Sequence, residues 1–480
     1  MIGIFVAYLV LTVALGLWQA TRTRSQADFV LGGSRLPGWM LALSERATGE
    51  SAWLLLGLTG FVYANGLSAV WIAVGCLAGI STAWIVLAAK FRAEAARYGA
   101  LTMPEYFAAK FPEKAHAIRF VSTLIIVFFF VFYVGAQFAG AGKTLHATFG
   151  LDPFWGQVIA ALAILGYATF GGFVSVVAVD SLQAILMILT LVVAPIMMIA
   201  KVAAGPVTIG AALAAGGSGM SSLTGGVGGF AAGLLIFNNF AWFFGYLGGQ
   251  PQLNARFMAM RDDRQVRIGR NIAVLWTILA YGGALTIGLC SLVLFGPRAF
   301  ADTEMVLPHA LTRLFPWWLA GILLAGAVAA MVSTAESMLI VAGTSISQDV
   351  YNGLIKRGTA PDRTLLAVSR GATLLVGLFG LGLALTTENL IYYIVSFAWA
   401  GIGCSFAPAV LLSFYWDRFG ARGVVSALLA GLVTTVVWIA TGLDQKVTAM
   451  AVSFFVSMGV AVAVTLMTRP EGRELSMISD

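Results

Sequence analysis

The stretch that decides the fold is Leu41–Gly60, which reads LALSERATGESAWLLLGLTG. It is long and apolar enough to span a membrane, yet it contains Glu45, Arg46 and Glu50, with Gly49 among them. A charge at bilayer depth costs roughly 2.5–3.5 kcal/mol on the insertion scale unless it faces a partner, a cavity or water. We therefore predict a helix that breaks in mid-membrane and turns its freed backbone groups towards something bound there.

The composition places this stretch in a polytopic helical membrane protein. Of the 480 residues, 60% are hydrophobic and 10% are charged, and apolar runs of membrane-spanning length recur from end to end. No soluble domain has this composition. The three cysteines, Cys76, Cys290 and Cys404, lie in apolar runs without metal-ligand spacing, so no disulfide framework is expected. The N-terminal apolar run has no basic region and no cleavage site, and we interpret it as a retained first span.

We predict thirteen membrane spans, each about 20 residues long or more, in a single domain covering residues 1–480. They lie near 2–20, 37–63, 68–90, 118–142, 154–171, 177–201, 229–249, 271–296, 317–348, 366–386, 390–414, 421–441 and 447–468. An odd number of spans puts the two termini on opposite sides of the membrane.

The distribution of basic residues predicts the orientation. With the N-terminus outside, 22 of the 28 Lys and Arg residues fall in cytoplasmic segments, five fall outside, and Arg46 lies in the membrane. The cytoplasmic group includes Arg22, Arg24, Arg35, Arg256, Arg469 and Arg473. This asymmetry satisfies the positive-inside rule, so we expect a cytoplasmic C-terminus and a location in the cell inner membrane. The net charge of +7 then reflects orientation and contact with lipid headgroups, and no nucleic-acid partner is expected.

The ninth predicted span contains adjacent hydroxyl side chains, Ser333 and Thr334. Hydroxyls in an apolar helix commonly bond back to the carbonyl four residues earlier, and this interpretation stays open. The alternative is ligation of Na⁺, because hydroxyls and unwound carbonyl groups bind small hard cations in transporters built on broken helices. Asp180, at the start of the sixth span, is either a charge stabilised at a helix N-terminus or a further cation ligand.

The seventh span carries two aromatic side chains, Trp242 and Tyr246, four residues apart and so on one helix face. Packing is the ordinary role of such a pair. The helix-breaking residues Gly248, Gly249 and Pro251 follow directly, however, and favour a second broken helix with an aromatic wall for a solute. Both interpretations stay open.

The charged residues of the second span also admit two interpretations. Arg46 and Glu50 are four residues apart and would pair in a continuous helix, or Arg46 could face a substrate carboxylate. Together with Glu45, Asp180 and Glu336 they carry a net charge of −3 if all are ionised, which favours cations in the cavity.

Two patterns that resemble enzyme motifs do not support catalysis. The sequence GAGKT at 140–144 resembles a phosphate loop, but Gln137 stands where a glycine is required and no strand precedes it. The histidines His116, His146 and His309 are scattered, and there is no nucleophile elbow. We expect no catalytic residues and no enzyme activity.

With these residues in view, the chain resembles the sodium/solute symporter family, most closely its bacterial sodium/proline branch. The resemblance covers nearly the whole length. It is carried by DFVLGGSRLPGW at 28–39, ESAWLLLGLTG at 50–60, LTMPEYFAAKF at 101–111, FGGFVSVVAVDSLQAILM at 170–187, QPQLNARFMA at 250–259, AAMVSTAESMLIVAGTSISQDVY at 329–351 and VSFAWAGIGCSFAPAVLLSFYW at 395–416.

The resemblance implies an all-α fold of the leucine-transporter type with thirteen helices and a 5+5 inverted repeat. The repeats would be residues 37–201 and 229–414, preceded by an extra helix at 2–20 and followed by two helices within 421–468. It also implies a sodium ion, the coupling ion, at the carbonyls of Ala47, Glu50 and Ala330 and the hydroxyls of Ser333 and Thr334, with Asp180 on the ion path. Ser51, Trp53, Tyr133, Trp242 and Tyr246 match positions lining the proline cavity.

Some residues depart from the proline pattern. Proline symporters carry an aspartate where this chain has Gly49, and Glu50 is the nearest replacement. Arg46 replaces a small residue and Glu336 replaces a serine, so both become candidate substrate-binding residues, or they form an internal ion pair with each other. The chain also has one extra residue between Tyr246 and Gln250.

We expect a monomeric secondary active transporter that couples Na⁺ entry to uptake of a small solute by alternating access, with proline as the expected solute. Another amino acid, a monocarboxylate or pantothenate remains an alternative cargo, and proton coupling remains a variant. A solute-binding sensor or a channel is the alternative from a different class.

Overall fold

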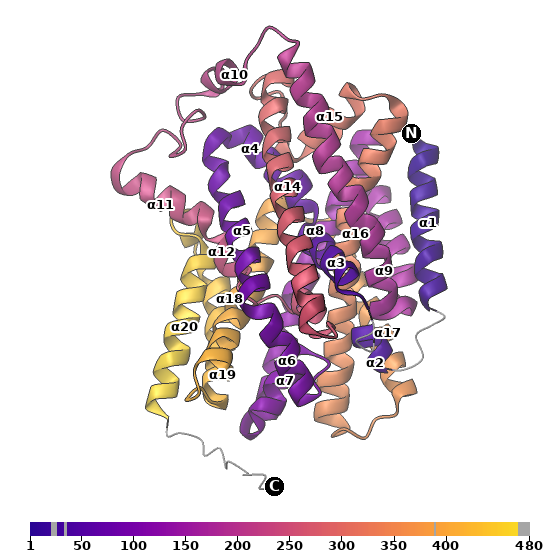
Figure 1. Cartoon of the computed structure of the whole chain (residues 1–480), viewed down its shortest axis with the longest axis vertical. Helices are drawn as coiled ribbons and strands as arrows, with labels where there is room; N and C mark the ends of the chain where they lie inside the picture. The colour runs from indigo at the N-terminus through magenta and orange to yellow at the C-terminus, as the bar shows by residue number, and fades with distance from the viewer. Residues whose placement is uncertain (21–25, 33–35, 388–389, 469–480) are drawn as a thin grey trace.

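The computed structural model describes residues 1–20, 26–32, 36–387 and 390–468, and the regular elements in that part of the chain are all helices (Figure 1). Arg22, Arg24, Arg35, Arg469 and Arg473, which enter the orientation argument, lie outside these ranges. Ten segments of the described chain are long and apolar enough to cross a membrane. The molecule is therefore an all-helical, multi-pass membrane protein.

Counting helices by length and apolar character gives ten segments where the sequence predicts thirteen spans, because bent and interrupted helices are not counted as separate spans. This count merges the end of the second predicted span with the third in Trp53–Tyr98 and the fifth with the sixth in Pro153–Ala203. The seventh predicted span appears only as a short apolar stretch, Gly229–Gly245, because its helix is interrupted. The number thirteen stays a prediction.

The described first half of the chain contains two helices before the broken segment and two long helices, α8 and α9, among shorter ones after it. The elements are α1 (Ile2–Ala20), α2 (Gln26–Leu31), α3 (Gly38–Gly49), η2 (Trp53–Leu58), α4 (Thr59–Asn65), η3 (Gly66–Ala69), α5 (Val70–Thr82), η4 (Ala83–Leu87), α6 (Ala88–Tyr98), α7 (Met103–Lys110), η5 (Pro112–Lys114), α8 (Ala115–Phe149), α9 (Pro153–Ala203) and α10 (Ile209–Gly216). The 51 residues of α9 contain a sharp bend at Gly172, whose φ of 65° is one that glycine adopts without strain.

The second half of the chain repeats this alternation of short and long helices. Its elements are α11 (Gly229–Phe240), α12 (Trp242–Gly245), α13 (Pro251–Met258), α14 (Asp263–Phe295), η6 (Thr303–Met305), α15 (Val306–Leu314), α16 (Trp317–Thr344), η7 (Ser345–Ile355), α17 (Asp362–Thr386), α18 (Ile391–Tyr415), α19 (Ala421–Ala440), η8 (Leu443–Gln445) and α20 (Ala449–Met467). In Figure 1, α10 lies at the end of the molecule where α1 begins, and α20 ends at the opposite one.

The centre of the bundle is α16, which is buried without interruption from Leu323 to Ile340. It packs against α8, α9 and α17, and the short half-helix α3 lies against it. A helix that is apolar all round belongs in the interior of a bundle, and the small residues of α16 allow its neighbours to approach closely. The polar side chains of α16 are therefore held at fixed positions opposite α3.

Candidate functional site

The second predicted span is broken, as its charges predict. Helix α3 ends at Gly49, and Glu50 leaves helical geometry with φ −111° and ψ 52°. Helical structure resumes at Trp53 as the π-helical turn η2. Within the break, the backbone N–H of Ala52 donates to Oε1 of Gln137 on α8 at 3.0 Å. The break is thus stabilised by the neighbouring helix.

A second break follows Tyr246, and the glycines and proline after it predict its place. Helix α12 ends at Gly245, and a new helix, α13, begins at Pro251. Between them Gly248 has a φ of +75°, which a residue with a side chain rarely adopts. All eight residues of α13 are buried, so the chain continues inside the protein beyond Gly249, where the sequence predicts the span to end. Arg256, assigned from the sequence to the cytoplasmic surface, is consequently an interior residue.

The hydroxyl pair of α16 faces the end of α3. The Ser333 hydroxyl lies 3.0 Å from the carbonyl oxygen of Ala47 and 3.1 Å from that of Ala330, and it can donate to either. The Thr334 hydroxyl donates to the carbonyl oxygen of Thr48 at 2.9 Å. Ser333 thus bonds back to a carbonyl of its own helix, three residues earlier, and also reaches α3, while its role as a Na⁺ ligand stays a prediction. The described contacts bring Thr48, rather than Glu50, to the pair.

These five oxygens suit a small hard cation. All are neutral hydroxyl or carbonyl groups on buried residues, the donor set that Na⁺ accepts in transporters with broken helices. Binding an ion there would require the two hydroxyl hydrogens to turn away from the carbonyl groups. The carbonyls of Ala47 and Thr48 are available because α3 stops at Gly49, which leaves its last carbonyls without helical donors.

Asp180 belongs to a buried polar network beside this hydroxyl pair. It lies in α9, eight residues beyond the Gly172 bend, and is fully buried, so the interpretation as a boundary charge at a helix N-terminus is wrong. Its Oδ2 accepts from the Ser44 hydroxyl at 2.6 Å and from Nη2 of Arg256 at 3.0 Å. Arg256 also donates to Ser44 and to the Ser337 hydroxyl. Its guanidinium thus links α13 to α3, α9 and α16.

Glu336 lies with Asp180 and away from Arg46. Its polar neighbours are Asp180, Tyr167 and Arg256, and no described group makes a hydrogen bond of good geometry with either carboxyl oxygen. The predicted Arg46–Glu336 ion pair is wrong. Glu336 is on the α9 side of α16, and the described contacts do not bring it to the aromatic residues predicted to line the cargo site.

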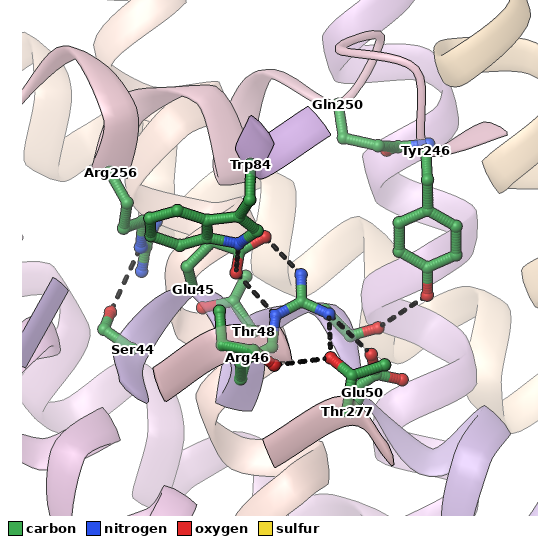
Figure 2. Close-up of polar contacts among 12 residues, drawn as sticks. Ser44, Glu45, Arg46, Thr48, Glu50, Trp84, Tyr246, Gln250, Arg256 and Thr277 are labelled. Atoms are coloured by element: carbon green, nitrogen blue, oxygen red, sulfur yellow. Dashed lines mark hydrogen bonds and ion pairs between the residues drawn. The ribbon is translucent and has the colours of Figure 1, made fainter. Parts of the chain in front are cut away.

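Arg46 instead lies between two glutamates of its own segment (Figure 2). Its guanidinium contacts both carboxyl oxygens of Glu45, and its Nη1 lies 2.9 Å from Oε1 of Glu50. Glu45 also accepts from the indole N–H of Trp84 at 3.0 Å, and Glu50 accepts from the Tyr281 hydroxyl at 2.8 Å. The predicted Arg46–Glu50 pair is confirmed, since α3 continues to Gly49 and the Glu50 N–H still bonds to the Arg46 carbonyl.

The aromatic residues meet between the two breaks. The rings of Trp53 and Trp242 stack with centroids 4.0 Å apart and planes 8° apart. The Tyr246 hydroxyl lies 3.2 Å from the Tyr281 hydroxyl. The Ser51 and Tyr133 hydroxyls are 3.0 Å apart. The five side chains that the resemblance predicts to line the cargo cavity therefore lie in one region, where the second, fourth and seventh predicted spans meet.

Two cavities adjoin this region. One of about 240 Å³, on the side of α11, is lined by Trp242, Tyr392 and Asn239 among others. The other, about 10 Å³, lies between Arg46, Tyr246 and Gln250 and has room for about one water molecule. The stacked indoles lie between the larger cavity and the break, because Trp242 borders that cavity and covers Trp53.

Comparison with known proteins agrees with this geometry. The model of the sodium:solute symporter family matches residues 29–431. The chain belongs to the sodium:solute symporter family. It is therefore a transporter rather than an enzyme, takes a small-molecule substrate and uses Na⁺ as its coupling ion. Its resemblance to the family, inferred from the sequence motifs, is confirmed.

Individual relatives agree with the family match. The chain is 31% identical to the osmoregulated proline transporter OpuE of Bacillus subtilis over 96% of this chain and 94% of that protein. It is 32% identical to the sodium/proline symporter of Salmonella typhimurium, over 91% of this chain and 87% of that protein. The fold matches that of a Na⁺-coupled sialic acid symporter in a substrate-bound outward-open state, with a TM-score of 0.81 and 18% identity over 98% of this chain and 97% of that chain.

Several residues of the site escape prediction from the sequence. Thr48 contributes its backbone carbonyl and Gln137 contributes its side-chain oxygen, which accepts from the Ala52 N–H, and nothing in their sequence context distinguishes them. Tyr281 is an isolated tyrosine in an apolar helix, a weak signal that it has a polar partner. Trp399, whose ring lies 4.8 Å from that of Tyr246, is contained in the family motif at 395–416. Arg256 is a further residue of the site that the sequence does not place there. With it, the site contains four buried carboxylates, those of Glu45, Glu50, Asp180 and Glu336, and the two guanidinium groups of Arg46 and Arg256.

Proposed function

We propose that this symporter carries proline into the cell together with Na⁺. The similarity to two proline transporters over more than nine-tenths of the chain supports this cargo. So does the aromatic region between the breaks, because rigid aromatic faces suit a small apolar ring. Polar hydroxyls at Ser51 and Tyr133 border the same region and suit the charged ends of an amino acid.

The observation that carries the sodium assignment is the hydroxyl pair facing the broken helix. In the proposal, the carbonyls of Ala47 and Ala330 and the hydroxyls of Ser333 and Thr334 bind the ion. The carbonyls of Thr48 and Glu50 are the remaining candidates at the end of α3, and Asp180 lies on the path of the ion to the cytoplasm. Ser51, Trp53, Tyr133, Trp242 and Tyr246 bind the cargo.

Coupling follows from where the ion would bind. An ion held between α3 and α16 fixes the inner half of the broken span against the bundle and so stabilises one conformation. It raises affinity for cargo only if the cargo prefers the same conformation, and the effect is reciprocal. The membrane potential adds about 2.3 kcal/mol per charge per 100 mV to the import of Na⁺.

We further propose thirteen crossings of the cell inner membrane, arranged as two inverted repeats at 37–201 and 229–414. The bend in α9 supports two crossings there, since 51 residues are too long for one. Just before α9 begins, Lys143 pairs with Glu304, which follows the end of α14. Just after α9 ends, helix α10 also packs near the end of α14. Both ends of α9 are thus on one side. The N-terminus is outside, the C-terminus is cytoplasmic, and the protein works as a monomer.

The test is proline uptake by proteoliposomes containing the Thr334→Ala variant. Loss of one ion ligand should raise the Na⁺ concentration for half-maximal uptake about tenfold or more, since a bond to a charged group is worth about 1.5–3 kcal/mol. Thr286→Ala is the matched control, because Thr286 is exposed on α14 and only bonds back to Gly282. If the Na⁺ concentration for half-maximal uptake were unchanged in Thr334→Ala, the assignment of the ion site would be wrong.

One observation favours a different cargo. The Glu45–Arg46–Glu50 cluster lies at the break, where the proline pattern has a small residue at position 46 and an aspartate at position 49, and the added arginine would alter the field that the cargo meets. Counterflow of labelled proline against unlabelled amino acids, monocarboxylates and pantothenate decides the cargo. Proline should exchange best, and exchange of another compound in its place would replace proline in the proposal.

A further inference from the structure

The guanidinium of Arg46 lies in a shell of oxygen atoms. Its Nε and Nη2 contact the two carboxyl oxygens of Glu45, and its Nη1 lies 2.9 Å from Oε1 of Glu50 and 3.5 Å from the Thr277 hydroxyl. Arg46, Glu45 and Glu50 are all fully buried or nearly so. An arginine stays protonated in proteins, so the position holds a permanent positive charge.

The oxygen shell lies at the end of the helix that precedes the break. Glu45 lies within α3, Glu50 caps its C-terminus, and Thr277 comes from α14. A cation at this position therefore holds the end of α3 against a neighbouring helix. Four oxygens that converge on one positive charge form the kind of environment in which Na⁺ or another monovalent cation binds.

Gly49 makes room for this arrangement. A Cβ atom at position 49 would lie 3.4 Å from Nη2 of Arg46 and 3.6 Å from a methyl group of Leu253. These are ordinary contact distances, so an alanine would fit, whereas a longer side chain would have to enter the space that the guanidinium fills.

The same contacts bear on the alternative that Arg46 binds a substrate carboxylate. Three of its nitrogens already face Glu45 and Glu50, and both glutamates have further donors in Trp84 and Tyr281. Releasing Arg46 to a substrate anion would leave two buried carboxylates without their cation, which is costly. Arg46 is therefore placed as the permanent internal partner of these two glutamates.

We propose that Arg46 is a built-in cation, whose guanidinium occupies an oxygen-lined position at the break in the second span that would otherwise take a mobile monovalent cation. Its place in a transport cycle rests on the proposed function, but the binding claim does not. Because the charge is tethered, it stays at the break when the coupling ion at the hydroxyl pair leaves.

The experiment measures thermal unfolding of the purified full-length chain in detergent, with guanidinium chloride at low millimolar concentrations as the probe and choline chloride to keep ionic strength constant. Arg46→Ala should unfold at a lower temperature. Guanidinium should restore the midpoint, with a gain that grows with the logarithm of its concentration, as for a ligand that binds the folded state. The wild-type protein should show no such gain, because its own guanidinium fills the position.

The matched control removes the carboxylates as well. The triple variant Glu45→Gln, Arg46→Ala, Glu50→Gln should be more stable than Arg46→Ala without added cation, and guanidinium should no longer stabilise it, because the charges that attract a cation are gone. Arg46→Lys, which keeps a shorter tethered cation, should be less sensitive to guanidinium than Arg46→Ala.

Two results would overturn the proposal. One is a folded Arg46→Ala variant that guanidinium, Na⁺ and Li⁺ stabilise no more than they stabilise the wild type. The other is an Arg46→Ala variant that cannot be recovered with or without guanidinium while the triple variant folds. Because neither readout uses transport, failure of proline uptake would contradict the proposed cargo and leave this inference standing.

Discussion

Gly249 marks the closest approach of two backbones in the second broken segment. A Cβ atom at this position would lie 1.9 Å from the carbonyl oxygen of Gly403 in α18. No side chain can move to relieve that contact, because the obstacle is backbone. The absence of a side chain at 249 and 403 is therefore what lets the non-helical link lie against the middle of α18.

At this scale we predict that Gly249→Ala strongly destabilises the protein, by about 3 kcal/mol or more, since overpacking without room to relax exceeds the usual cost of about 1–3 kcal/mol. Gly282→Ala is the matched control. Gly282 lies in α14 with open space around it, so alanine should be neutral or stabilise by up to about 1 kcal/mol. Thermal unfolding in detergent compares the two. Equal midpoints would show that the link and α18 are further apart than described.

Single residues also show where sequence reasoning succeeds and where it stops. The cost of burying charge at Glu45, Arg46 and Glu50 was enough to predict the first break. The i,i+4 spacing also predicts the Arg46–Glu50 pair, but nothing local predicts the partners Trp84 and Tyr281, because those come from distant helices through tertiary packing. Arg256 was misplaced for a related reason, since a glycine pair and a proline ordinarily end a span, whereas here the chain re-enters a buried helix.

At the scale of elements, the start of α18 is held by a glutamate from another part of the chain. Glu304, in η6 after α14, accepts from the backbone N–H of Tyr392 at 2.9 Å. Its second oxygen binds Lys143 of α8 at 2.6 Å, and Lys143 also binds Asp302 at 2.8 Å. A carboxylate at a helix N-terminus is favourable because it meets unpaired N–H groups and the positive end of the dipole. The contact ties α18 to α8.

We predict that Glu304→Ala lowers the free energy of unfolding by about 1–3 kcal/mol, because it leaves a buried N–H and an ammonium group with one partner fewer. Glu113→Ala is the control, since Glu113 is exposed in η5 and should be silent. Chemical denaturation followed by tryptophan fluorescence gives both values. A Glu304→Ala protein as stable as the wild type would mean that solvent replaces the carboxylate without cost.

At the scale of the whole molecule, the sequence predicts orientation through charges and the structure supplies reporters for it. The three cysteines are free and buried, so the unmodified chain gives little background in labelling with thiol reagents. Ser218, between α10 and α11, and Thr359, after η7, are both exposed. The predicted topology places them on opposite sides of the membrane. Apolar periodicity predicted most elements at this scale, whereas the number of crossings depended on interrupted helices that simple hydropathy does not resolve.

We predict that an impermeant maleimide labels Ser218→Cys in intact cells and labels Thr359→Cys only after the membrane is permeabilised. The wild-type chain, treated in parallel, should remain unlabelled. The reverse pattern would invert the proposed orientation, and labelling of both variants in intact cells would contradict the assignment of these segments to opposite sides.

The stacked indoles of Trp53 and Trp242 have a consequence for observing the protein at work. Two aromatic chromophores 4.0 Å apart and nearly parallel couple their electronic transitions, and one belongs to each broken segment. Any motion that parts the two segments must weaken that coupling. Near-ultraviolet circular dichroism can therefore serve as an intrinsic optical gauge of their separation, without a label attached to the protein.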